Sequence, residues 1–390
     1  MTFTPTDKLL LSALLPTATN QQRLTELLSN SEIDWALAVR RSMAGGTAAL
    51  LRWNLARAAV LGRVPKPEQE LLEKESHSWA VRQQIYVAEA TQLIEAFREK
   101  GIASLPLKGA ALMLGEYYPL PGLRSAVDVD LLLPAEQAEA AFALAEARGY
   151  EKVEIKKPVR VAVPLAHELR HLPVLRGRSG VLLELHYRAF HDLRRHRDFG
   201  WAEMAERAVR RNDVLLPATE DLALHLIQHT IVDLTSAYAI LRTLADLHFL
   251  FAAEPKARGR LLIRAEEFAL SGAVNMALDA LDCLEANTFE QAGAQARLLL
   301  ETALMGSSQS LFETARLFEY LDLRQQPVAR IKHLYQLLTL ENAPQPSATV
   351  PSSGSLLNRV SAMWRRLHWK GVAWTDVRRV LAIRKITQSK

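Results

Sequence analysis

The feature that most constrains this chain is a short apolar run, residues 127–133 (VDVDLLL), that carries two carboxylates, Asp128 and Asp130. A short run rich in Val and Leu is typical of a buried strand. Side chains of a strand alternate between its faces, so residues two apart share one face. Two adjacent carboxylates among apolar residues repel each other and are poorly solvated, and a divalent cation would compensate their charge. We therefore expect a strand with a metal site on one face.

The segments around this strand are predicted to change from helices to a mixture of strands and helices. Residues 1–100 place apolar side chains every three or four positions, which predicts helices. Residues 102–107 (IASLPL) are predicted to form a strand that ends at a glycine turn, Lys108-Gly109, before a helix. Further along we expect a helix over 134–149, strands over 151–163, 167–175 and 181–190, and a turn at 176–180 that joins the last two strands into a hairpin.

Beyond residue 216 the pattern is helical again, and a Pro/Ser-rich stretch follows it. The predicted fold class is α+β, with a small α/β module inserted between mostly helical regions. The expected regions are a helical N-terminal region (1–100), the α/β module (101–200), a helical C-terminal domain (201–345), a linker (346–355) and a basic amphipathic tail (356–390). Because few backbone hydrogen bonds should cross the linker, we expect the body to fold without the tail.

The cysteine content and the lengths of the apolar segments bear on where in the cell the protein is expected to work. The single cysteine, Cys283, excludes an internal disulfide. The opening residues have no convincing signal-peptide pattern, and no segment reaches about 18 uninterrupted apolar residues. We expect a cytoplasmic protein without a transmembrane segment.

The net charge of +5 is concentrated in the tail. Residues 356–390 hold nine Lys or Arg and one acid, a local charge of +8, which leaves about −3 for the rest. Trp, Leu and Arg recur in the tail at helical spacing. Such a helix could contact an anionic membrane, nucleic acid or a protein partner, or it could dock on the acidic body, which we favour slightly.

A metal site for nucleotidyl transfer would need a third acid beside Asp128 and Asp130, and positive groups to bind the phosphates of the nucleotide. Transfer of a nucleotidyl group uses two divalent cations held by about three acids on adjacent strands. Glu184, within the apolar stretch VLLELHY, is the expected third acid, and His186 shares its face. Lys108 and Gly109 are expected to meet the phosphates of a nucleotide, because a strand-to-helix glycine turn lets backbone N–H groups approach an anion. Arg124 is a second expected cation.

Four motifs in this order resemble the uncharacterised-nucleotidyltransferase family of the DNA polymerase beta superfamily. They are LKG at 107–109, YPLPGLR at 118–124, DVD at 128–130 and ELHY at 184–187. The resemblance covers about residues 85–250. It implies a polymerase-beta-like nucleotidyltransferase module with a mixed sheet at 101–200. It also implies Asp128, Asp130 and Glu184 as catalytic metal ligands, with Lys108, Gly109 and Arg124 at the nucleotide.

The resemblance implies a metal-dependent transferase that moves NMP from an NTP to an acceptor. The expected cofactor is Mg²⁺ or Mn²⁺, and the expected nucleotide is ATP. The acceptor is a small molecule, a peptide or a protein, reacting through a hydroxyl or a phosphate. The sequence departs from the family at Ser125-Ala126-Val127, where Pro-Met-Gly is commoner, and at Glu184, where Asp is commoner. The first departure bears on nucleotide contacts and the second on metal geometry.

Two other functions stay open from the sequence. One is a nucleotide-binding module that has the fold without turnover, and the other is a nucleic-acid- or membrane-associated scaffold acting through the basic tail. The roles of several residues also have plainer alternatives. Glu184 could pair with Arg124 or Arg188 in a structural salt bridge, and His186 is more often a packing residue than a catalytic one.

Two pairs of residues on later helices have plain interpretations. His225 and His229 are four residues apart but lack any further zinc motif, so core histidines are expected. Arg242 and Asp246 are most simply a helix-surface ion pair, with the alternative that one of them reaches the nucleotide.

Overall fold

The computed structural model describes residues 2–153, 171–192, 197–211, 213–232, 237, 239–305 and 374–388. Within these ranges, buried apolar side chains from Phe3 to Ile383 form one continuous core. No helix of the described residues has both the length and the apolar character needed to cross a bilayer.

The N-terminal region is helical, as the apolar spacing predicts. Its elements are α1 (Pro5–Ser12), α2 (Ala18–Asn30), α3 (Trp35–Gly45), α4 (Ala48–Arg57) and the 3₁₀ turn η1 (Leu61–Arg63). α1 begins with a reciprocal cap, in which the Thr4 side chain accepts from the Asp7 backbone and the Asp7 side chain accepts from Thr4. α3 ends at Gly46, which has the left-handed conformation (φ 67°) common at helix ends.

A five-stranded mixed sheet forms the centre of the α/β module. Its strands are β1 (Leu105–Pro106), β2 (Asp128–Leu132), β3 (Glu151–Lys152), β4 (Leu175–Arg176) and β5 (Leu182–His186). They lie in the order β1-β2-β5-β4-β3. β2 and β5 are parallel, and the other pairs are antiparallel. The predicted α+β class with a mixed sheet is confirmed.

Several strands differ in extent from the prediction. β1 and β4 have only two residues each, and the predicted strand over 151–163 is described only at its start, because 154–170 lie outside the described residues. The hairpin across the turn at 176–180 is present as β4 and β5. The stretch 181–190 is divided between β5 and β6 (Arg188–Asp192), and β6 pairs with β7 (Arg197–Gly200) in a separate two-stranded sheet.

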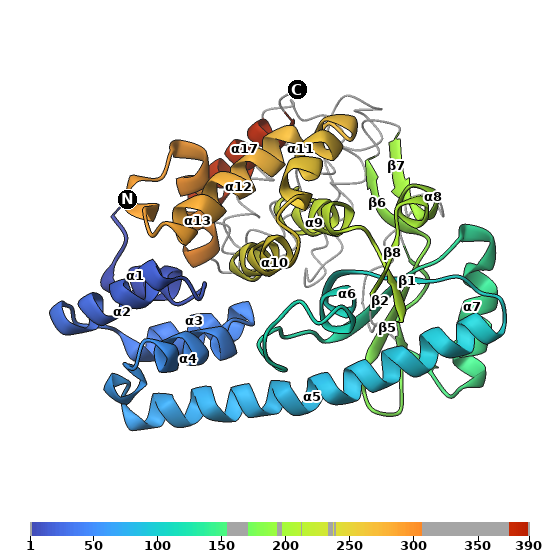
Figure 1. The fold of residues 1–390 in the computed structure, drawn as a ribbon, viewed down its shortest axis with the longest axis horizontal. Coiled ribbons are helices and arrows are strands. Elements are labelled where there is room, and N and C mark those ends of the chain that lie inside the picture. The colour runs from blue at the N-terminus through green and yellow to red at the C-terminus, as the bar shows by residue number, and fades with distance from the viewer. Residues whose placement is uncertain are drawn as a thin grey trace, which may run out of the picture.

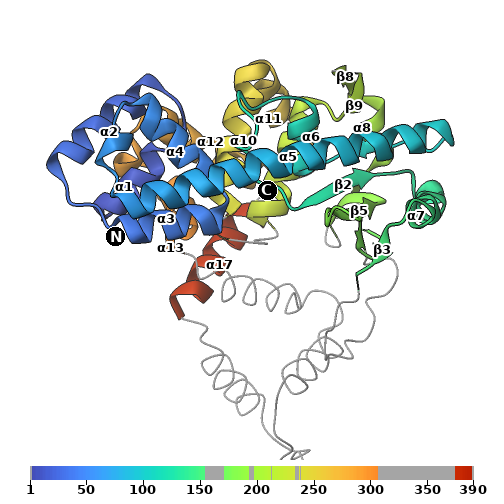
Figure 2. The same cartoon turned by 90° about the horizontal axis from the view of Figure 1, so that it is seen from below.

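Helices cover the sheet and connect it to the N-terminal region. α6 (Lys108–Leu114) follows β1, and the 3₁₀ turn η2 (Ala135–Gln137) and α7 (Ala138–Ala147) follow β2. The long helix α5 (Lys66–Glu99) runs from α3 and α4 to α6 and α7, along the length of the molecule (Figures 1 and 2). Tyr86, Ala90, Leu93 and Phe97 recur every three or four residues on α5 and are buried, which makes one face of this helix part of the core.

From Trp201 onward, the elements of the described residues are helices apart from one small hairpin. The elements are α8 (Trp201–Glu206), the hairpin β8 (Val209–Arg211) and β9 (Val214–Leu216), α9 (Thr219–Ile227), the π-helical turn η4 (Gln228–Val232), α10 (Ala239–Ala253), α11 (Ala257–Glu267), α12 (Ser271–Glu285), the 3₁₀ turn η5 (Phe289–Gln291), α13 (Ala294–Met305) and α17 (Trp374–Gln388). The expected linker, 346–355, lies outside the described residues, and the domain boundaries stay predictions.

The described part of the basic tail packs against the body. α17 lies beside α12, α13 and η4 (Figures 1 and 2). Val380 and Ile383 are fully buried in the common core, whereas Leu381 is 44 % exposed. This arrangement agrees with the favoured interpretation of the tail as a helix docked on the body.

Candidate active site

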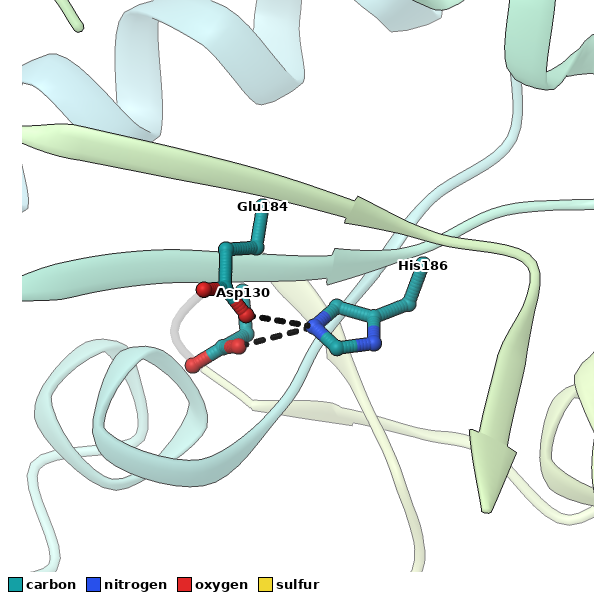
Figure 3. A group of neighbouring side chains, drawn as sticks. All are labelled: Asp130, Glu184 and His186. Atoms are coloured by element: carbon teal, nitrogen blue, oxygen red, sulfur yellow. Dashed lines mark hydrogen bonds and ion pairs between the residues drawn. The ribbon is translucent and has the colours of Figure 1, made fainter. Parts of the chain in front are cut away.

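The acids of the predicted site meet where β2 and β5 run side by side. In this parallel pair Asp130 lies opposite Glu184, and His186 is two residues further along β5. His186 Nε2 lies 2.9 Å from Asp130 Oδ1 and 3.2 Å from Glu184 Oε2 (Figure 3). One ligand atom from each of these three residues lies within 4.8 Å of the other two, which is close enough for all three to hold one metal ion. We call Asp130, Glu184 and His186 the carboxylate–histidine group.

Lys108 lies among these carboxylates. Its Nζ is 2.6 Å from Asp130 Oδ1 and 3.9 Å from Glu184 Oε2. Lys108 has φ 47°, a left-handed conformation that is uncommon for a residue with a side chain, and it begins α6 directly after β1. The sequence placed this ammonium at the phosphates, and the structure places it against the acids.

Gly109 permits the close approach of α6 to the loop before β2. A Cβ on Gly109 would lie 2.8 Å from the Cβ of Ala126 and 3.5 Å from Arg124 Nη1. The first of these separations is shorter than real Cβ contacts allow, so a side chain at 109 would push the helix and the loop apart. Gly109 therefore sets the distance between α6 and the Arg124 guanidinium.

The charges of the group depend on one another. Burial by itself would raise the pKa of Asp130, but the Lys108 ammonium and the hydrogen bond from His186 hold it well below its usual value. Burial would lower the pKa of His186, and its hydrogen bonds to Asp130 and Glu184 outweigh this effect and raise it. The group is thus a buried ionic network in which Asp130 is a carboxylate.

Asp128 has a different environment from Asp130. It is partly buried, and it is not one of the three residues whose ligand atoms meet. Burial, reinforced by the negative charge of Asp130, raises the pKa of Asp128 to about 6. The two acids share a strand face, as predicted. Among the described residues, Lys108 and His186 lie at ion-pair distance from Asp130. Lys108 and Arg242 also lower the pKa of Asp128, but by less than burial and the Asp130 charge raise it.

The donor atoms fit a divalent cation. Asp130 has no exposed surface, and its Oδ2 has no hydrogen-bond partner among the described residues. An unpaired buried carboxylate oxygen is costly, and a metal ion would satisfy it. Carboxylate oxygens suit Mg²⁺ and Mn²⁺, and an imidazole nitrogen beside them is a better ligand for a transition metal than for Mg²⁺.

Arg124 is held by a carboxylate from the helical C-terminal region. Its Nε lies 2.8 Å from Asp246 Oδ1 on α10, and the Tyr118 hydroxyl donates to the same oxygen at 2.6 Å. The loop before β2 is thereby fixed to α10. Arg124, one of the two partners expected for Glu184, pairs with Asp246 instead.

The interpretation of Arg242 and Asp246 as a helix-surface ion pair is wrong. Asp246 has no exposed surface, and its ion pair is with Arg124. Within the described part of the chain, Arg242 forms no ion pair with Asp246. The four-residue spacing that suggested a pair was overridden by a contact from a segment more than a hundred residues away.

The segment Ser125-Ala126-Val127 joins the module to the N-terminal helices. Ser125 is buried and its hydroxyl donates to the Gly46 carbonyl at 3.1 Å, whereas Val127 is 62 % exposed. His225 and His229 have stacked rings with centroids 6.1 Å apart, and neither belongs to a metal-binding group among the described residues.

Tyr86 lies within electrostatic reach of the site acids, and the sequence did not reveal it. It lies on α5, it is buried, and its hydroxyl has no hydrogen-bond partner among the described residues. Burial, and then the charges of Asp130 and Asp128, raise the pKa of Tyr86 well above its usual value. Its only sequence signal is its place on the apolar face of α5, which any core tyrosine would share.

Comparison with known proteins agrees with this geometry. No curated protein and no solved structure matches the chain. The sequence profile of a family described as uncharacterised nucleotidyltransferase matches residues 31–284, a range that contains the sheet, the carboxylate–histidine group and α10. Because this match covers more than half of the sequence, the chain belongs to the uncharacterised nucleotidyltransferase family.

Proposed function

We propose that this protein transfers NMP from an NTP to a hydroxyl or phosphate of a small molecule, peptide or protein. The acceptor oxygen bonds to the α-phosphorus, the bond from that phosphorus to the bridging oxygen breaks, pyrophosphate leaves, and the acceptor proton passes to water. The observation that carries the proposal is the register of β2 and β5, which sets Asp130 beside Glu184 with one buried carboxylate oxygen unpaired.

The side chains have distinct roles in this proposal. Asp128, Asp130 and Glu184 would hold Mg²⁺ or Mn²⁺, which when bound neutralises phosphate charge and acidifies the acceptor hydroxyl. His186 donates to Asp130 Oδ1 and leaves Oδ2 for the cation. Gly109 keeps α6 close to Arg124, which supports placing the phosphates at this turn. ATP as the nucleotide and a cytoplasmic location belong to the same proposal.

The test is incubation of the full chain with each radiolabelled NTP and Mg²⁺ or Mn²⁺, with pyrophosphate release and labelled products, including labelled protein, as readouts. We expect metal-dependent release that Asp128→Asn and Asp130→Asn abolish and that Glu184→Gln abolishes or strongly reduces. Glu139→Gln is the matched control, because it makes the same chemical change at an exposed acid of α7. Wild-type turnover in either aspartate variant would refute the assignment.

A nucleotide-binding module without turnover is the second candidate function. One observation favours it: the Lys108 ammonium lies 2.6 Å from Asp130 Oδ1 and 3.9 Å from Glu184 Oε2, and it therefore offsets part of their negative charge. This alternative predicts that NTP binding is independent of divalent cations and that no pyrophosphate is released. The same incubation, with binding measured in EDTA, separates the two functions.

A further inference from the structure

Arg242 lies where three segments of the chain converge. It belongs to the first turns of α10, and its guanidinium is partly buried. Its Nη1 is 3.0 Å from the point that a Cβ on Gly46 would occupy, and the Ser125 side chain meets the same point. The turn after α3, the loop before β2 and the start of α10 therefore enclose this guanidinium.

Among the described residues, the guanidinium of Arg242 has no ion-pair partner. No hydrogen bond or ion pair engages its guanidinium within the described part of the chain. Asp246, one turn along α10, is held by Arg124 and Tyr118. Burial, and then the nearby charge of Arg124, lower the pKa of Arg242 to about 10, so the protein disfavours this cation where it lies. A cation in such a place without an ion-pair partner is costly to stability, and a bound anion would offset that cost.

The guanidinium of Arg242 interacts electrostatically with an acid of the candidate site. Asp128 is among the charges that raise the pKa of Arg242, which places the guanidinium within electrostatic reach of β2. Lys108, by contrast, is occupied by Asp130 and Glu184. Arginine binds phosphate through two parallel hydrogen bonds, which gives it an advantage over lysine at such a position.

We propose that Arg242 binds the β- and γ-phosphates of the nucleotide, so that the polyphosphate chain extends from Asp128 toward α10. The inference rests on the proposed function for the identity of the ligand as an NTP. It departs from the sequence-based expectation, because the principal phosphate cation comes from the C-terminal helices and not from the Lys108-Gly109 turn. α10 would then form one wall of the nucleotide site.

The test uses inorganic tripolyphosphate as the probe, with binding to the full chain measured calorimetrically at about 0.15 M salt in EDTA and again with Mg²⁺. We expect Arg242→Gln to weaken binding roughly 10- to 100-fold, as for the loss of a charge-assisted hydrogen-bonded pair. The affinity of Arg242→Lys for tripolyphosphate should lie between those of the wild type and Arg242→Gln, because lysine keeps the positive charge but cannot make two parallel hydrogen bonds to a phosphate. Arg258→Gln is the matched control: it removes the same charge from α11, where the side chain is already paired with Asp282.

Thermal unfolding of the same variants separates binding from structure. Loss of an unpaired, enclosed charge should leave the melting temperature of Arg242→Gln without ligand unchanged or raised. Tripolyphosphate should raise the melting temperature of the wild type by more than that of the variant. A variant that melts clearly below the wild type without ligand would make Arg242 structural and overturn the inference.

The remaining outcomes distinguish this inference from the proposed function. If tripolyphosphate binding depends on Arg242 but no NTP is turned over, the anion site at Arg242 is supported and the proposed transferase function is refuted. If Arg242→Gln turns over NTP with an unchanged KM, the proposed transferase function is supported and the anion site at Arg242 is refuted. Absence of tripolyphosphate binding in both conditions, or binding lost only in Lys108→Met, would also overturn it.

Discussion

Asp128 and Asp130 are identical side chains on one strand, but the protein shifts their pKa values in opposite directions. Asp130 is fully buried but is contacted by Lys108 and His186, whereas Asp128 is partly buried and has no ion pair among the described residues. From the sequence, removing either carboxylate should relieve repulsion and leave stability unchanged or higher. The structure keeps that expectation for Asp128 and reverses it for Asp130.

The first stability prediction concerns pH. The pKa of Asp128 is raised from 3.8 to about 6 in the folded protein, so the folded state favours the protonated form. The contribution of Asp128 to the free energy of unfolding is therefore fully present below about pH 4 and is lost as the pH rises through 6. Asp128→Asn should therefore be more stable than the wild type at pH 8 in EDTA, by about 1–3 kcal/mol, and equally stable below about pH 4.

Asp130→Asn should change stability in the opposite direction. Its pKa is lowered, so its carboxylate stabilises the fold above its unfolded pKa, and the variant leaves Lys108 and His186 without that partner. Urea unfolding from pH 4 to 8 in EDTA measures both variants. Stability changes of the same sign in the two variants at pH 8 would contradict the environments described here.

At the scale of elements, the loop between α6 and β2 is fixed at both of its sides. Gly122 has φ 83°, and a Cβ there would lie 2.6 Å from the backbone nitrogen of Ala80 on α5. Its own N–H donates to the Gln83 side chain at 2.6 Å. Further along, Arg124 is held by Asp246 on α10. The position of this loop, and so of the strand that carries the acids, therefore depends on its contacts with α5 and α10.

Gly122→Ala should destabilise the protein by more than Gly180→Ala. Both glycines have a left-handed conformation, with φ 83° and 88°, but a Cβ on Gly180 would meet nothing within 4 Å. The control should show only the backbone strain of about 1 kcal/mol, and Gly122→Ala should add a packing cost of about 1–3 kcal/mol. Urea unfolding of the two variants gives the comparison, and equal losses would mean that the loop can move off α5.

At the scale of the whole molecule, the chain forms one core that includes the end of the tail. α17 contributes two fully buried aliphatic side chains to a surface formed by α12, α13 and η4. Removal of the chain after Ser353 would expose that surface. The sequence-based expectation that the body folds independently of the tail is therefore replaced by the expectation of a less stable, aggregation-prone truncation.

Two alanine substitutions on α17 test this role of the tail. Ile383→Ala should cost about 2–4 kcal/mol, because it leaves a cavity in the core. Leu381→Ala, on a side chain that is 44 % exposed, should change stability by no more than about 0.5 kcal/mol. Chemical denaturation of the full chain is the measurement. Equal small effects would show that α17 contributes little to the core and that the tail is available for a partner.

The sequence alone determined the features that depend on neighbouring residues. Periodic apolar positions specify α5 and the N-terminal helices, and the alternation within 127–133 puts Asp128 and Asp130 on one face of a strand. An acid within a second apolar run identified Glu184 as the residue that pairs with Asp130 across β2 and β5. These signals are readable because helix and strand geometry repeat every few residues.

Only the tertiary structure decided which charges meet. Arg124 pairs with Asp246 across 122 positions of sequence, Lys108 lies against Asp130, and Arg242 has no ion pair within the part of the chain that the structure describes. The docking of α17 is a contact of the same long-range kind. Such pairings leave no periodic pattern, because they depend on how the helices and the sheet pack together. The sequence therefore specified the acids of the candidate site, and the packing of distant helices decided which cations lie against them.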